Sequence, residues 1–178
     1  MGSRPLTDPA ANRPLTDPAA NPGRPLGLRP ATAADADLLL AWANDPSVRA
    51  ASLQSDPIDR GTHVAWLASR LASDACRIWI GVEPGGRAVG VIRFERDDDG
   101  RAVVSISVDR DARGRGYGAT LLALGLAASA AALEPAGYRA WVRPGNAASL
   151  AMFERAGFRR VEPGSRADVV ELIRDAVV

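Results

Sequence analysis

One stretch, Arg101–Ala128, constrains the fold of this chain more than any other. Its β-branched run, Val103–Val108, predicts a strand. A short polar segment follows, and then glycines at positions 114, 116 and 118 lead into an Ala- and Leu-rich segment that predicts a helix. A strand, a glycine-rich turn and a helix in this order leave backbone N–H groups at the positive end of the helix. The stretch therefore predicts an anion site, typically for phosphate.

Two common phosphate-binding patterns can be compared with these glycines. The spacing Gly114-x-Gly116-x-x-Ala119 fits a dinucleotide fingerprint, which also needs a parallel βαβ unit and an acidic residue about 20 positions later. Around Tyr138, in the next expected strand, the chain has Arg139 and Trp141, and no carboxylate. A P-loop is excluded because the chain contains no lysine.

The composition excludes several further classes of function. The 178 residues carry a net charge of +1, which favours neither nucleic acid nor an anionic membrane as a partner. Cys76 and His63 are each the sole residue of their type, so an intramolecular disulfide and a Cys/His zinc site are excluded. Asp97–Asp99 fits a solvated turn, and we expect no metal. All 22 basic residues are arginine, which with the many alanines and glycines indicates a GC-rich bacterial genome.

The chain divides into a tail and one domain. The sequence RPLTDPAAN occurs twice in succession, at Arg4–Asn12 and Arg13–Asn21. This duplication is rich in Pro and Asp and cannot bury a core, so we expect residues 1–25 to be a disordered tail and residues 26–178 to be the folded domain. No apolar run is long enough to span a membrane and no signal-peptide core is present, so we expect a cytoplasmic protein.

The pattern of elements predicts an α/β fold with a mixed, mostly antiparallel sheet and flanking helices. The expected strands are 26–30, 78–82, 88–94, 103–108, 138–142, 158–162 and 168–173, and the expected helices are 32–43, 62–73, about 118–132 and 147–156, with a short helical turn at Pro46. Asn146 and Gly157 fit the cap positions of the last helix, and residues 163–165 fit a turn.

Two motifs resemble the GNAT superfamily of N-acetyltransferases. Arg113-x-x-Gly116-x-Gly118 resembles motif A, and Asn146–Phe158 resembles the helix that follows the splayed strand, with Phe153 at the usual tyrosine position. The resemblance implies a GNAT fold with a splayed strand pair, and acetyl-CoA as cosubstrate. It also implies cofactor contacts from both motifs, at Val108, Arg113, Gly114, Arg115, Gly116, Tyr117, Gly118, Ala119, Asn146, Ser149 and Phe153.

A narrower resemblance lies upstream of these motifs. Trp42-x-Asn44-Asp45-Pro46, Ser55–Ile58 and His63-x-x-Trp66 are similar to the GNAT branch that acetylates nucleotide-linked 4-amino sugars, the pseudaminic-acid pathway type. Ribosomal-protein and other amine acetyltransferases carry a similar segment. The resemblance implies acceptor-binding roles for Trp42, Asn44, Arg49, Asp56 and Trp66. The same residues also fit a purely local reading, with the tryptophans in the core and Asn44 and Asp45 capping a helix.

Acetyl transfer requires an unprotonated amine, a polarised thioester carbonyl and a proton for the leaving thiolate. The resemblance implies that a backbone N–H near Ser107 or Val108 polarises the carbonyl. Phe153 cannot donate a proton, and Trp141 occupies the position of the glutamate base that some relatives use. Either positioning alone suffices, or a base comes from elsewhere, with His63, Glu95 and Asp56 as candidates in that order.

The sequence therefore predicts an N-acetyltransferase for a primary amine of a small molecule, acting as a monomer or homodimer. A nucleotide-linked 4-amino sugar is the sharper hypothesis for the acceptor. Acetylation of protein N-termini and non-catalytic binding of acyl-CoA, as a sensor or interaction module, are the alternatives.

Overall fold

The computed structural model describes residues 15–16, 25–52, 56–162 and 168–176. Its helices are α1 (Ala36–Ala43), α2 (Pro46–Ala51), α3 (Arg60–Leu71), α4 (Tyr117–Leu133) and α5 (Ala147–Arg155), with short 3₁₀ turns η2 (Ala33–Asp35) and η3 (Arg110–Ala112). Its strands are β1 (Leu15–Thr16), β2 (Gly27–Pro30), β3 (Cys76–Val82), β4 (Ala88–Arg96), β5 (Ala102–Val108), β6 (Gly137–Val142), β7 (Arg159–Arg160) and β8 (Val170–Asp175).

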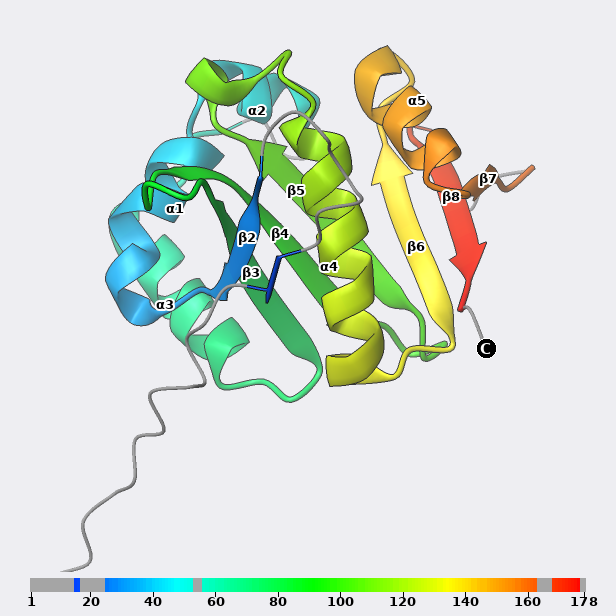
Figure 1. Cartoon of the computed structure of the whole chain (residues 1–178), viewed down its shortest axis with the longest axis horizontal. Helices are drawn as coiled ribbons and strands as arrows, with labels where there is room; N and C mark the ends of the chain where they lie inside the picture. Colours follow the sequence, from blue (N-terminus) through cyan, green and yellow to red (C-terminus); the bar gives the residue numbers. More distant parts are fainter. Residues whose placement is uncertain (1–14, 17–24, 53–55, 163–167, 177–178) are drawn as a thin grey trace, which may run out of the picture.

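The strands form one mixed sheet between two layers of helices (Figure 1). The strand order is β1-β2-β3-β4-β5-β6-β8-β7, and every neighbouring pair is antiparallel except β5 and β6. One core lies between the sheet and α4 and α5 and includes Phe94, Leu121 and Phe153. A second core lies on the opposite face under α1 and α3 and includes Leu39, Leu67 and Ile80. The predicted α/β class with a mostly antiparallel sheet is confirmed.

The parallel pair β5 and β6 is joined at one end only. The register runs through Ala102–Tyr138 and Val103–Arg139 and then stops, although both strands continue to Val108 and Val142. Figure 1 shows the two strands diverging beside α4 and α5. This pair is the splayed pair that the family resemblance implies.

The C-terminal hairpin differs in detail from the sequence prediction. A strand was expected from Phe158, but β7 begins only at Arg159. The Phe158 N–H donates to the carbonyl of Phe153 at 3.0 Å, and its side chain is buried, so this residue completes the end of α5. The turn expected at 163–165 lies outside the described residues.

The tail contributes one short strand to the sheet. β1 lies in the second copy of the repeat and pairs with β2 through Leu15–Leu28 and Thr16–Gly27. The sheet therefore begins before residue 26, where we expected the domain to start. The rest of the duplicated segment lies outside the described residues.

Candidate active site

The turn between β5 and α4 leaves the start of α4 open. Gly114 and Gly116 have φ of +72° and +82°, a conformation that glycine adopts without strain. Gly116 is the N-cap of α4, and no side chain caps this helix within the described residues. By contrast, side chains of Asp45, Asp59 and Asn146 cap α2, α3 and α5. The first turn of α4, including Gly118 and Ala119, thus presents backbone N–H groups and the helix dipole to an anion.

Tyr117 and Arg115, both expected to contact the cofactor, take different positions at this turn. The Tyr117 side chain is buried, and its hydroxyl donates a hydrogen bond to Glu83, at the end of β3. It therefore anchors the start of α4 and leaves its backbone for a ligand. Arg115 is exposed, so its charge lies on the surface of the turn.

The hydrogen bonds between β4 and β5 fix the direction of each N–H on β5. The Asp109 N–H donates to the Val89 carbonyl at 2.9 Å. Hydrogen-bonding direction alternates along an antiparallel pair, so the N–H of Ser107, in register with Val91, also points to β4. Its side chain shares the face on which Val91 packs under α1 and α3. Ser107 therefore does not present its N–H to the gap between β5 and β6.

The N–H groups of Ile106 and Val108 point the opposite way, towards β6. The ladder to β6 ends at Val103, so both groups lie where the strands have already diverged. Ile106 is the deeper of the two, nearer the joined end. Of the two N–H groups expected from the sequence, that of Val108 faces the gap. Ile106 supplies a further N–H that faces the gap and was not predicted.

Helix α5 follows β6, the strand that diverges from β5. The Asn146 side chain accepts a hydrogen bond from the Ser149 N–H at 3.1 Å, so Asn146 holds the start of this helix as predicted. Phe153 is buried and packs edge-on against Phe158, with ring centroids 5.0 Å apart. The Met152 side chain reaches α4 at Gly118. A Cβ added to Gly118 would lie 3.1 Å from the Met152 sulfur. Glycine at position 118 thus permits the close approach of α4 and α5.

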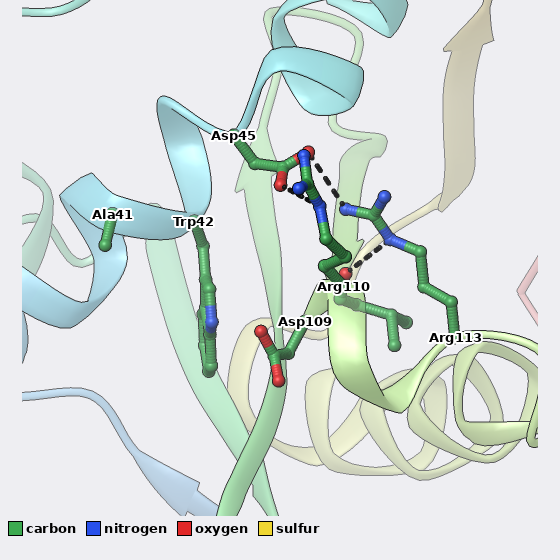
Figure 2. Close-up of a pocket in the computed structure, with 7 residues that line it drawn as sticks. Ala41, Trp42, Asp45, Asp109, Arg110 and Arg113 are labelled. Carbon is green, nitrogen blue, oxygen red and sulfur yellow. Dashed lines mark hydrogen bonds and ion pairs between the residues drawn. The ribbon is translucent and has the colours of Figure 1, made fainter.

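A cavity of about 230 Å³ adjoins the end of β5 on the α1 side (Figure 2). Its lining residues are Ala41, Trp42, Asp45, Val108, Asp109, Arg110 and Arg113. Neither His63 nor Glu95, the first two candidate bases, lines this cavity.

Asp45 joins this cavity to the glycine turn. Its carboxylate lies 3.0 Å from Arg110 and 3.4 Å from Arg113, and Arg113 also donates to the Val108 carbonyl at 3.0 Å. Hydrogen bonds, chiefly from the Ser47 hydroxyl, hold the pKa of Asp45 at about 2, so it stays ionised. Arg113, which we expected to contact cofactor, is held here between β5 and α2.

Asn44 and Arg49 have structural partners. The Asn44 amide donates to the Ile58 carbonyl at 2.8 Å and accepts from the Ile58 N–H at 2.9 Å, which pins the end of α1 to the segment before α3. Arg49 donates to the Asp56 carbonyl at 3.1 Å and to the Ser52 hydroxyl at 3.0 Å. The Asp56 side chain is exposed, and Ser55 lies outside the described residues.

The open turn and the gap fit acetyl-CoA. Uncapped N–H groups at the start of α4 suit a pyrophosphate, and the N–H groups of Ile106 and Val108 suit an amide chain that ends in a thioester. The model of the family described as "Acetyltransferase (GNAT) domain" matches residues 25–159, most of the chain. The chain belongs to the GNAT acetyltransferase family. It is an acyltransferase that uses acetyl-CoA.

Solved structures with the same fold include several GNAT acetyltransferases. One is spermidine N-acetyltransferase from Vibrio cholerae in complex with CoA and spermine, at 16% identity and a TM-score of 0.73, covering 83% of this chain and 93% of that one. Another is a putative phosphinothricin N-acetyltransferase, at 24% identity and a TM-score of 0.73, covering 86% and 99%. A third is a putative acetyltransferase from Salmonella typhimurium with acetyl-CoA, at 21% identity and a TM-score of 0.70, covering 84% and 93%. A search of curated proteins finds no match.

His63, the first candidate base, is buried in the GNAT fold. It is 4% exposed, and its ring lies 5.5 Å from that of Trp66. Burial lowers the pKa of His63, while a backbone hydrogen bond with Ala36 and the charge of Asp37 oppose that shift. The side chain is therefore neutral near pH 7 and faces the packing between α1 and α3.

Glu95, the second candidate, lies at the far end of β4. It is in register with Val103, four residues before Ser107, which places it about 13 Å from that residue along β5. Its carboxylate pairs with Arg70 at 2.9 Å. The structure thus brings Glu95 towards the joined end of the splayed pair and away from the glycine turn.

Within the described ranges, no three His, Cys, Asp or Glu side chains cluster closely enough to hold a metal ion. Nor does this part of the chain contain a helix with the length and apolarity needed to cross a membrane.

Proposed function

We propose that this GNAT enzyme acetylates a primary amine of a small molecule, which attacks the thioester of acetyl-CoA directly. The observation that carries the proposal is the gap beside β5, where the N–H groups of Ile106 and Val108 face away from β4. Donors fixed in this way stabilise negative charge as it develops on a carbonyl oxygen. Bound acetyl-CoA supplies the activated acyl group, and the chain supplies position and polarisation.

We further propose that the amine nitrogen releases its proton to solvent as the amide forms, and that the leaving thiolate takes its proton from solvent. Phe153 carries no hydroxyl and packs in the core, so it serves the shape of the gap. An unperturbed thiol has a pKa of about 8.5, so protonation of its thiolate near neutral pH needs no dedicated acid. His63 and Glu95 are engaged in packing and in an ion pair, which supports catalysis mainly by positioning.

The acceptor proposal is a small amine, with a nucleotide-linked 4-amino sugar as the first compound to assay. The segment that suggests the amino-sugar branch has local uses in this fold. Asn44 clamps the chain at Ile58, and Asp45 caps α2. Because these residues have local uses, the segment does not by itself favour an amino sugar, and the small amine is the broader proposal.

Calorimetric titration with acetyl-CoA, followed by a thiol-release assay against a panel of amines, tests this function. Gly116→Glu should abolish acetyl-CoA binding, because it places a negative charge at the start of α4. Gly86→Glu is a matched control: Gly86 has φ +83°, close to the +82° of Gly116, and has open space around its Cβ position. The control carries the same charge and similar backbone strain but should bind normally.

Two results would count against the proposal. Undiminished acetyl-CoA affinity in Gly116→Glu would show that the start of α4 does not bind the phosphates of acetyl-CoA. Tight acetyl-CoA binding by the wild type with no turnover of any amine would favour the non-catalytic alternative.

A further inference from the structure

Arg93 lies on the face of the sheet that α1 and α3 partly cover. On β4, Val91 packs under these helices, and Arg93 follows it two residues later, so both side chains point to this face. Arg93 is in register with Ser105 of β5, which is exposed. Ser105 is the neighbour of Ile106, whose N–H faces the gap. Arg93 therefore lies across one strand from the proposed position of the acyl group.

The guanidinium of Arg93 has little to bind within the described chain. It stacks on Trp66 of α3, with its central carbon 5.2 Å from the ring centroid. Its Nε is buried and has no hydrogen-bond partner among the described residues. The carboxylate of Glu95 lies 4.0 Å from this Nε and is already paired with Arg70 at 2.9 Å. Two guanidiniums thus share one carboxylate, which leaves a net positive charge here.

A second donor without a partner lies across the gap, on β6. Ala140 and Val142 belong to the core under α4, so Trp141 between them points to the same face as Arg93. The Trp141 Nε1 is buried and has no hydrogen-bond partner among the described residues. The two groups thus lie on the same face of the sheet, on the strands at either side of β5.

Both groups can donate hydrogen bonds and neither can accept one. A ligand that satisfies them must therefore supply acceptor oxygens, and the positive charge favours an anion. We propose that Arg93, supported by Trp66, and the indole N–H of Trp141 bind an anionic oxygen group of the acceptor amine. The preferred acceptors are therefore amines that also carry a carboxylate or a phosphoryl group. This inference rests on the proposed function.

Matched pairs of acceptors test it in the intact enzyme. One pair is an amino acid and its carboxamide, and the other is an amino sugar phosphate and the free amino sugar. Arg93→Gln should raise KM for the anionic members by at least about tenfold and change KM for the neutral members by less than about twofold. For each pair, the increase in KM on going from wild type to Arg93→Gln is compared between the anionic and the neutral member. The pair with the larger difference shows whether the site prefers a carboxylate or a phosphoryl group. Because each compound is compared between variant and wild type, differences in amine basicity cancel.

Three further variants separate recognition from folding. Arg93→Lys keeps the charge and should recover part of the lost affinity, while Trp141→Phe should weaken binding of the same anionic compounds only. Arg60→Gln is the charge-matched control, since Arg60 is exposed and its surface pair with Asp37 contributes little. Acetyl-CoA affinity should be unchanged in all of them.

The results separate failure of this inference from failure of the proposed function. Wild-type enzyme that acetylates neutral and anionic amines equally well, or an Arg93→Gln variant that loses both equally, overturns the inference alone. Wild-type enzyme that binds acetyl-CoA and acetylates no amine overturns the proposed function and this inference with it.

Discussion

Proline can remove the backbone N–H groups of β5 one at a time. Ser107→Pro deletes an N–H that bonds to β4, whereas Ile106→Pro and Val108→Pro delete N–H groups that face the gap. The three substitutions impose the same restriction on φ. Alanine at the same positions measures the effect of losing each side chain. After that effect is subtracted, differences in stability and kinetics among the proline variants show which way each N–H points.

The expected magnitudes follow from the lost bonds. Ser107→Pro leaves the carbonyl of Val91 without its partner in the sheet, which should lower the free energy of unfolding by about 1–3 kcal/mol. Val108→Pro and Ile106→Pro break no bond to β4. One of them should lower kcat by about 100- to 1,000-fold, as expected for loss of a donor to a developing oxyanion. The other should weaken acetyl-CoA binding, because its N–H faces the same gap.

Urea denaturation measures the stability of each variant, and thiol release measures its kcat and KM. The reasoning fails if Ile106→Pro and Val108→Pro both keep the kinetics of their alanine controls. It also fails if Ser107→Pro is folded and selectively loses kcat, because the polarising N–H would then be the one we place against β4.

Two further predictions concern stability. Gly90→Ala should destabilise the fold by about 1–3 kcal/mol in urea denaturation, since its Cβ would lie 2.6 Å from the Ser107 carbonyl oxygen. Gly85→Ala, with nothing within 4 Å, is the control, and equal stability of the two would contradict the clash. Asp35 has a pKa of about 2, against 3.8 ordinarily, chiefly because of its hydrogen bonds with Arg29. A lowered pKa stabilises the fold above about pH 4, and this contribution is lost as pH falls towards 2. Wild type should therefore lose about 2 kcal/mol more than Asp35→Asn between about pH 5 and pH 2, and parallel profiles would refute the pairing.

Local patterns were sufficient for the elements and their ends. Asn146 caps α5 and Gly157 follows it with φ +84°, as the residue types at those positions predict. The glycine turn and the helix behind it also lie where the sequence places them. These features depend on residues that are close together in the chain, so periodicity and cap chemistry are sufficient to find them.

The partners of the candidate site residues were not predictable in the same way. Glu95 pairs with Arg70, and Asp45 pairs with Arg113, 68 residues away, because the fold brings distant segments together. The sequence also left open whether the N–H of Ser107 or that of Val108 faces the gap, for a different reason. Strand residues alternate in N–H direction, and only the register with β4 shows which of them face the gap.

The short register between β5 and β6 also has a mechanical consequence. Hydrogen bonding divides the sheet into a unit of β1–β5 and a unit of β6–β8, joined by two residue pairs. A molecule held by the N–H groups of Ile106 and Val108 takes the place of the missing rungs between these units. By linkage, its binding free energy adds to the stability of that joint. Under the proposed function, bound acetyl-CoA joins the two units as an additional strand would, and each turnover removes and replaces that connection.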